Sequence, residues 1–247
     1  MSSTPHLFYQ PRVRLLGRAF QLIGYEGLFR SVTLSGEALP PARLPTMQRA
    51  QLASCEHFMW SLDTATRFMR ELGNPASLTI SLNLPGHLLE HRAFYECMLN
   101  WILDDEDRAR GIEIEILESS VIHDLSRVAE RLGRLRRAGI RFSLDDFASG
   151  YAGLSYLRTL PIDIVKINPA LVMSATVEKA DRRFLEGVLV LLNGLGKKIV
   201  LEGIESAASL ALIRNFDIHG LQGYYFGRPM PAHQAIRYPH TQTLTVS

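Results

Sequence analysis

The stretch Phe142-Ser143-Leu144-Asp145-Asp146 decides how the chain is interpreted, because a short hydrophobic run ends there in two adjacent carboxylates. Neighbouring carboxylates repel each other, so a fold that brings both to the end of a strand favours a cation between them. The same arrangement recurs at the ends of other β-rich runs: Tyr25-Glu26, Leu82-Asn83, Ile114-Glu115, Val165-Lys166, Leu201-Glu202 and Leu221-Gln222. Strands that each end in a polar side chain are typical of an α/β barrel with its active site at the carboxyl ends of the strands.

Helical patterns alternate with these strands after residue 45, which predicts a parallel sheet. Residues 13–29 form two extended segments that meet near Leu16-Gly17, so we expect a hairpin there. The predicted fold is α/β, a single TIM-like (β/α)8 barrel with one antiparallel strand near the N-terminus. One barrel domain is expected over residues 1–247, with its core at 8–238 and a flexible tail at 239–247. Single helices are expected over 87–103 and 170–195.

Composition limits the classes of partner. Lys and Arg number 27 and Asp and Glu 25, so no net field favours DNA, an RNA duplex or an anionic membrane. Cys55 and Cys97 are isolated, which fits a reducing cytosol. The N-terminus lacks a signal-peptide pattern, and the apolar runs are too short to cross a bilayer. We therefore expect a soluble, cytoplasmic, stand-alone domain.

The polar residues at the strand ends are oxygen donors: Glu26, Asn83, Glu115, Asp145, Asp146 and Glu202. Such a set favours Mg²⁺ or Mn²⁺ over Zn²⁺, which prefers imidazole and thiolate. Two ions about 3.5–4 Å apart hold the attacking and leaving oxygens of an in-line phosphoryl displacement. Lys166 can neutralise charge among them or hold the attacking water. In the alternative interpretation, each carboxylate merely caps a helix or pairs with an arginine.

Several motifs occur in a fixed order along the chain: Tyr9-Gln10-Pro11, Glu26-Gly27-Leu28 with Arg30, Ser81–Leu84, Glu113–Ser119, Asp145–Leu157, Val165-Lys166-Ile167, Leu201–Glu205 and Gln222–Pro229. With these motifs the sequence resembles the EAL-domain phosphodiesterases of bacterial cyclic di-GMP signalling, from Phe8 to about Pro231. The resemblance implies a barrel with one antiparallel strand. It also implies hydrolysis of one phosphodiester of cyclic di-GMP to give linear pGpG.

The resemblance assigns roles residue by residue. It implies two divalent ions held by Glu26, Asn83, Glu115, Asp145 and Asp146. It implies that Lys166 and Glu202 position and activate the attacking water. It implies substrate contacts from Gln10, Leu28, Arg30 and Gln222, and loop-stabilising roles for Glu118 and Glu205. It further implies a homodimer through the loop after Asp146, where we expect Phe147, Tyr151 and Leu154 to be exposed.

The sequence also departs from the family pattern. Gly27 replaces the signature Ala, and Asn168 stands where the family has Asp. Residues 35–49 lack the usual Pro-x-x-Phe-Ile segment, which bears on one wall of the nucleotide groove. Some members of this superfamily have lost catalysis, so the alternative function is a cyclic di-GMP receptor or a protein-binding adaptor. Asn168 moves the chain one step that way, and we expect a weakened enzyme.

Three further patterns have structural interpretations. His87-Leu88-Leu89-Glu90-His91 fits an inverted zinc-protease motif but lacks a third ligand, so we interpret it as a solvated helix start. The run Gly194–Lys198 follows a helix and precedes a strand, the reverse of a P-loop, so a helix cap is predicted. A basic cluster is interpreted as a solvated helix face, with partner binding as the alternative: Arg131, Arg134, Arg136, Arg137 and Arg141.

Overall fold

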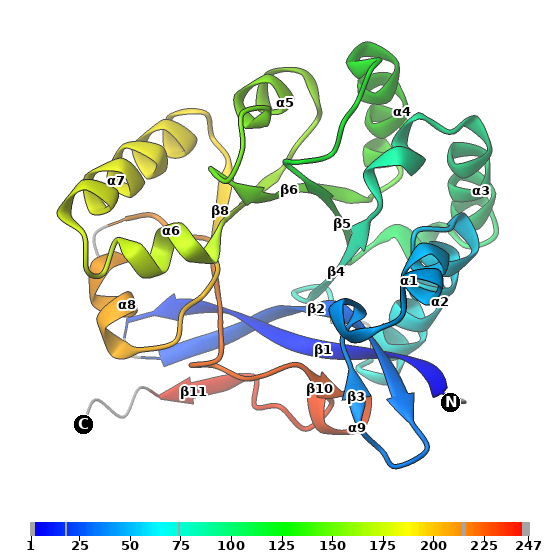
Figure 1. The fold of residues 1–247 in the computed structure, drawn as a ribbon, viewed down its shortest axis with the longest axis horizontal. Coiled ribbons are helices and arrows are strands. Elements are labelled where there is room, and N and C mark those ends of the chain that lie inside the picture. Colours follow the sequence, from blue (N-terminus) through cyan, green and yellow to red (C-terminus); the bar gives the residue numbers. More distant parts are fainter. Residues whose placement is uncertain (1–2, 18, 74, 214–215, 244–247) are drawn as a thin grey trace.

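The structure is a computed structural model that describes residues 3–17, 19–73, 75–213 and 216–243. Within these residues, eight strands close into a barrel (Figure 1): β1 (Ser3–Leu16), β2 (Ala19–Thr33), β4 (Thr79–Leu84), β5 (Ile112–Leu117), β6 (Arg141–Phe147), β7 (Ile164–Ile167), β8 (Lys198–Leu201) and β9 (Gly220–Gln222). Their order around the barrel is β1-β9-β8-β7-β6-β5-β4-β2, and β2 pairs with β1 to close it. The predicted barrel is therefore confirmed.

β1 is the antiparallel strand of the barrel. It pairs antiparallel with β2, where Gln10 lies opposite Glu26, and antiparallel with β9, where Arg12 lies opposite Gln222. The six other contacts between neighbouring barrel strands are parallel. The hairpin predicted at Leu16-Gly17 is confirmed, although both of its strands extend further than residues 13–29.

Helices surround most of the ring of strands (Figure 1). They are α1 (Thr46–Leu52), α2 (Cys55–Glu71), α3 (Arg92–Leu103), α4 (Leu125–Arg137), α5 (Gly153–Thr159), α6 (Pro169–Ser174), α7 (Lys179–Gly194) and α8 (Ala207–Ile213), with short 3-10 helices η1 (Pro41–Arg43), η2 (Gly86–Glu90) and η3 (Glu106–Ala109). No helix in the described ranges is long and apolar enough to cross a membrane.

Two predicted helices are each divided. The helix expected over 170–195 is α6 followed by α7, and Thr176 and Val177, which are β-branched and poor helix formers, lie between them. The helix expected over 87–103 is the 3-10 helix η2 followed by α3, which starts after His91.

The C-terminal segment covers the outer face of the hairpin, where the barrel has no connecting helix (Figure 1). It comprises β10 (Met230–Pro231), α9 (Ala232–Ala235) and β11 (Thr241–Thr243); β10 pairs with β1 and β11 with β2, and β2 also pairs with β3 (Ala38–Leu39). The buried Tyr25 hydroxyl donates to the Ala235 carbonyl at 2.8 Å. The expected tail at 239–247 thus contains β11, and residues 244–247 lie outside the described residues.

The alternation of Ile and Glu along β5 separates two buried environments. Ile112, Ile114 and Ile116 are buried on the face toward the helices, whereas Glu113 and Glu115 are fully buried on the face inside the barrel. Burial of each Ile side chain contributes about 1.5–3 kcal/mol of transfer free energy. Carboxylates inside the barrel have no such gain and require charged partners. The residues with unusual chemistry therefore lie inside the barrel.

Candidate active site

Lys166 of β7 is the centre of the polar cluster at the carboxyl ends of the strands. Its ammonium Nζ lies 2.8 Å from Glu115 Oε1 and 2.7 Å from Glu202 Oε1. It also lies 3.4 Å from Asp145 Oδ1 and 3.6 Å from Glu26 Oε2. Only 1% of the Lys166 side chain is exposed, so its charge acts with little solvent screening. Four strands thus bring four carboxylates to one cation.

A β-bulge lets the adjacent Asp145 and Asp146 face the same centre. Successive strand residues normally point to opposite faces. Between β6 and β7, however, Leu144 pairs with Val165 and Phe147 with Ile167, so β6 contains one extra residue. Asp146 adopts a left-handed backbone conformation with φ of 57°, which is uncommon for a residue other than glycine.

Asn168 holds Asp146 in this position. Its side-chain Nδ2 donates to Asp146 Oδ1 at 3.0 Å. Its Oδ1 accepts from the Ala170 backbone N–H at 2.8 Å and so caps α6. The amide at position 168 therefore both donates to a carboxylate and accepts at a helix start, and only the second of these is open to an ionised Asp.

A chain of amides surrounds Glu26 on the other side of the cluster. Glu26 accepts from Asn83 Nδ2 at 2.9 Å and from Gln222 Nε2, and Gln222 also donates to Gln10 Oε1 at 3.4 Å. Burial raises the pKa of Glu26, but the charge of Lys166 and the two amide donors outweigh it and leave this pKa below its usual value. These contacts fix one carboxylate in its ionised form.

The positive charge near Glu115 and Glu202 is too small to offset the effect of burial on the pKa of each carboxyl group. Burial raises the pKa of Glu115 well above its usual value, against the lowering by Lys166, and the neighbouring carboxylates of Glu26 and Asp145 raise it further. Burial also raises the pKa of Glu202 to about 8 despite the contact with Lys166. Burial alone would lower the pKa of Lys166, but the surrounding carboxylates hold it well above its usual value.

The cluster fits a divalent cation. Asp145, Asp146 and Glu202 form the one group of three His, Cys, Asp or Glu side chains in the described residues whose ligand atoms all lie within 4.8 Å of one another. In the described residues, Glu115 Oε2 is buried without a hydrogen bond, and Glu115 Oε1 and Asp145 Oδ1 have only their ion-pair contacts with Lys166. Oxygen donors of this kind suit Mg²⁺ or Mn²⁺.

Glu118 organises the loop that follows Asp146. Its carboxylate accepts from the backbone N–H groups of Ser149 and Gly150 at 3.1 Å each and of Gly153 at 2.9 Å. A Cβ at Gly153 would lie 2.9 Å from Glu118 Oε1, so the close approach needs glycine. Glu205, for which the family resemblance implies a similar role, is exposed at the mouth of the site.

The expected exposure of this loop is correct for two of its three residues. Tyr151 is fully exposed and Leu154 is 61% exposed. Phe147, however, is buried, because its side chain turns inward and packs against Gly153. The apolar surface of the loop is therefore smaller than predicted.

Two hollows meet beside the cluster. One, of about 270 Å³, is lined by Gln10, Glu26, Leu28, Asp145, Pro169, Glu202, Gly203, Glu205, Gln222, Gly223 and Tyr224. The other, of about 510 Å³, is lined on the far side of Leu28 by Arg30 and Asn83 and by residues of α1 and α2, including Arg49 and His57. Leu28 lines both hollows, so they adjoin at this residue of β2.

Gly27, the departure within the signature motif, is explained by its neighbour. A methyl group at position 27 would lie 2.7 Å from Leu82 Cδ2. Leu82 of β4 therefore fills the space that an alanine side chain would need, so the two strands are packed closely at this point.

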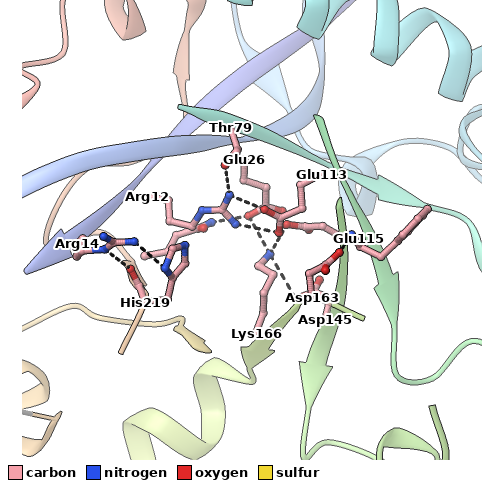
Figure 2. Close-up of polar contacts among 12 residues, drawn as sticks. Arg12, Arg14, Glu26, Thr79, Glu113, Glu115, Asp145, Asp163, Lys166 and His219 are labelled. Carbon is pink, nitrogen blue, oxygen red and sulfur yellow. Dashed lines mark hydrogen bonds and ion pairs between the residues drawn. The ribbon is translucent and has the colours of Figure 1, made fainter. Parts of the chain in front are cut away.

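The ion pair between the buried residues Arg12 and Glu113 was not predicted from the sequence. Arg12 of β1 donates to Glu113 Oε1 at 3.0 Å and to Glu113 Oε2 at 2.6 Å, inside the barrel (Figure 2). Gln10 and Arg12, like Glu113 and Glu115, are two residues apart on a strand. This period of two was the available signal, but the partners lie 101 residues apart in sequence.

The remaining motifs have structural roles. His87 lies in η2 and His91 follows it, and the Glu90 carboxylate accepts from the backbone N–H groups of His123 and Asp124. The zinc-protease pattern is therefore part of a helix junction. Gly194 ends α7 and Gly196 has φ of 66°, so the predicted helix cap is confirmed.

Comparison with known proteins gives a consistent result. The EAL domain family model matches residues 3–229. The chain is 30% identical over 233 residues to the bifunctional diguanylate cyclase/cyclic di-GMP phosphodiesterase MucR of Pseudomonas aeruginosa, covering 93% of this chain and 34% of that protein. It is 31% identical over 238 residues to the cyclic di-GMP phosphodiesterase NbdA of the same organism, covering 91% and 29%. The chain thus spans about a third of the length of these relatives.

Solved structures show the same similarity. The PaMucR phosphodiesterase in complex with c-di-GMP superposes with a TM-score of 0.83 at 29% identity, covering 94% of both chains. An EAL domain protein from Listeria monocytogenes EGD-e superposes with a TM-score of 0.78 at 27% identity, covering 94% of this chain and 91% of that one.

Proposed function

Because this chain belongs to the EAL domain family, we propose that it is a metal-dependent phosphodiesterase that hydrolyses cyclic di-GMP to linear pGpG. The observation that supports this most strongly is the buried Lys166 with four carboxylates within 3.6 Å of its Nζ. One ammonium cannot neutralise four carboxylates. The remaining charge calls for cations from solution, and relatives with this domain are cyclic di-GMP phosphodiesterases.

The charge count supports two divalent ions. The Lys166 cluster with Asp146 and the Arg12–Glu113 pair together hold six carboxylates and two cations: Glu26, Glu113, Glu115, Asp145, Asp146 and Glu202 against Arg12 and Lys166. When all are ionised, the excess is four negative charges, which equals the charge of two divalent ions. Glu26, Asn83, Glu115, Asp145 and Asp146 would hold them. Bound ions would supply Lewis acidity at the phosphoryl oxygens and make water a stronger nucleophile.

The chain's own residues have distinct roles in this reaction. Lys166 holds the Glu202 carboxylate at 2.7 Å, where we place the attacking water. Glu202 accepts a proton from this water as its oxygen bonds to phosphorus. The bond from phosphorus to the 3′-oxygen breaks, and that oxygen takes up a proton, which gives a 5′-phosphate. Arg30 contacts a phosphate, while Gln10, Leu28 and Gln222 line the nucleotide groove.

Asn168 favours one variant of this function. An Asn in place of the family's Asp removes a negative charge 3.0 Å from Asp146. We propose that metal binding, and hence turnover, is weakened and not abolished. The second candidate is a protein that only binds cyclic di-GMP or a protein partner. Such a protein has no turnover, so it would not depend on metal for hydrolysis.

We also propose a homodimer through the loop after Asp146. Tyr151 and Leu154 are exposed there, and Glu118 ties the loop backbone to the end of β5. Since Asp146 begins this loop, contacts between two copies would be linked to metal occupancy.

Product analysis tests the function. The pure protein is incubated with cyclic di-GMP and Mg²⁺, Mn²⁺ or Ca²⁺, and products are separated by chromatography. We expect pGpG with Mg²⁺ or Mn²⁺ and none with Ca²⁺, which prefers longer bonds and looser geometry. Intact cyclic di-GMP after long incubation at high enzyme and Mn²⁺, together with nucleotide binding in chelator, would support the receptor instead.

A further inference from the structure

A second layer of buried charge lies inside the barrel beside the Lys166 cluster, toward the amino ends of the parallel strands (Figure 2). Arg12 and Glu113 form a bidentate ion pair whose side chains are 2% and 0% exposed. Glu113 precedes Glu115 by two residues on β5, so both side chains point into the barrel, about 6.6 Å apart along the strand. The two layers are therefore close enough for their charges to interact.

Each member of this pair is attracted to the other layer. Lys166 is among the positive charges that act on Glu113, and Glu115 and Glu26 are among the negative charges that act on Arg12. An unpaired Glu113 would draw the Lys166 ammonium away from Glu202. An unpaired Arg12 would be drawn to Glu115 and Glu26, in competition with divalent ions.

The surroundings hold the pair in one geometry. Arg12 also donates to Thr79 Oγ1 at 2.6 Å, so its guanidinium is fixed to both β4 and β5. A Cβ at Gly24 would lie 2.2 Å from the Thr79 carbonyl oxygen and 2.8 Å from Thr79 Oγ1. Glycine at this position thus allows β2 to approach the Thr79 acceptor closely.

We propose that Arg12 is a positioning residue that keeps Glu113 away from Lys166, while Glu113 keeps Arg12 away from the metal ligands Glu26 and Glu115. Arg12 touches neither substrate nor metal in this scheme. It acts by confining a charge that would otherwise compete within the site. The inference rests on the proposed function, because it concerns the same Lys166 cluster.

The experiment compares Arg12→Met, Glu113→Gln, the double variant and Arg12→Lys. Mn²⁺ affinity is measured by calorimetry without substrate, kcat and KM with cyclic di-GMP, and folding by thermal melting. Arg136→Met is the control, because Arg136 pairs with Asp163 at 2.6 Å outside the catalytic cluster. It should match the wild type in kcat and in Mn²⁺ affinity.

The two single variants should fail in different ways. Loss of an outer partner of this kind typically costs about 10–100-fold. We expect Arg12→Met to lower kcat by about that factor, with KM and Mn²⁺ affinity little changed, because Lys166 leaves Glu202. We expect Glu113→Gln to weaken Mn²⁺ binding by about that factor, because Arg12 is free to approach Glu115.

The double variant, together with the contrast between the two single variants, tests whether the pair acts by confining charge. It removes the competing charge on both sides, so we expect kcat and Mn²⁺ affinity to return to within about 3-fold of the wild type. Arg12→Lys, which keeps the charge, should also stay within that range. If the pair were only a structural link, both single variants would lower Tm and would impair kcat and Mn²⁺ affinity together, and removal of both charges could still relieve that loss. The proposal is therefore overturned if the two single variants show the same pattern of loss, or if the double variant is as impaired as the worse single variant.

The experiment also distinguishes failure of Arg12→Met to fold from failure of the proposed function. If Arg12→Met does not fold, the proposal still requires Glu113→Gln to weaken Mn²⁺ binding and the double variant to restore it. If the wild type binds Mn²⁺ but does not hydrolyse cyclic di-GMP, the proposed function fails. The Mn²⁺ affinities of Glu113→Gln and the double variant then still support or overturn the role of Arg12.

Discussion

Asn168→Asp is expected to destabilise the metal-free protein. The Asn168 amide donates to Asp146 Oδ1 at 3.0 Å, and an ionised Asp would replace this donor with a second carboxylate. A hydrogen bond to a charged group contributes about 1.5–3 kcal/mol. Repulsion between unit charges about 4 Å apart is up to ~4 kcal/mol at an effective dielectric constant near 20. Both side chains are partly exposed, so screening reduces the sum, and we expect the free energy of unfolding to fall by about 2 kcal/mol.

The same substitution is expected to strengthen metal binding. With divalent ions bound, the added negative charge becomes attractive, and an outer partner of this kind typically changes metal affinity about 10–100-fold. We expect the Mn²⁺ concentration for half-maximal hydrolysis to fall about 10-fold. A 10-fold tighter Kd adds about 1.4 kcal/mol of stabilisation at saturating metal.

The assay combines melting curves in EDTA and in Mn²⁺ with a Mn²⁺ titration of hydrolysis. The difference in Tm between the two conditions should be larger for Asn168→Asp than for the wild type. Asn193→Asp is the matched control, because Asn193 is exposed on α7 and gains the same charge away from the site. Superimposable Mn²⁺ titrations for wild type and Asn168→Asp would refute the reasoning and make position 168 neutral.

Three further predictions concern other residues. Glu202→Ala should lower kcat by about 10²–10⁴-fold with the fold intact, as expected for loss of a general base. His87→Ala should leave kcat unchanged. The opposite result in steady-state assays would show that the site is misassigned. Tyr151→Glu should shift the protein from dimer to monomer in sedimentation, and a monomeric, fully active wild type would contradict the dimer. Burial and the charge of Arg14 lower the pKa of His219 to about 4, below its unfolded value near 6.5, so the associated stability is present above pH 6.5 and lost as pH falls toward 4. After allowance for partial exposure, urea denaturation at pH 5 and pH 7.5 should show His219→Asn reducing the acid loss by about 1–2 kcal/mol, and an unchanged loss would show that His219 does not titrate in this way.

The barrel fold and most of its strands could be predicted from the sequence because each strand leaves a local signal. A short apolar run that ends in a polar residue identifies both the strand and its carboxyl end, as at Leu144-Asp145 and Leu201-Glu202. The break between α6 and α7 leaves a weaker signal. Thr176 and Val177 only lower helix propensity, and the turn depends on how both helices pack on the barrel.

Local patterns predicted the candidate ligands but not their arrangement. That Asp145 and Asp146 occur together is visible in the sequence, whereas their common orientation requires the bulge opposite β7. Phe147 directly follows that bulge, so the alternation along β6 could not predict that its side chain is buried. A period of two shows that residues share a face of a strand, but it does not show whether that face is inside or outside the barrel.

The pairing of Arg12 with Glu113 could not be predicted, because an ion pair between strands depends on which strands meet across the barrel. Once the pairing is known, its consequence follows from charge alone. Lys166 contacts four carboxylates, so a fifth carboxylate within reach would change which of them it holds. The bidentate contact with Arg12 removes Glu113 from that competition. A barrel that places carboxylates on its inner face therefore needs cations in both layers: Arg12 in the layer toward the amino ends of the strands and Lys166 in the layer at their carboxyl ends, where we propose that divalent ions add to its charge.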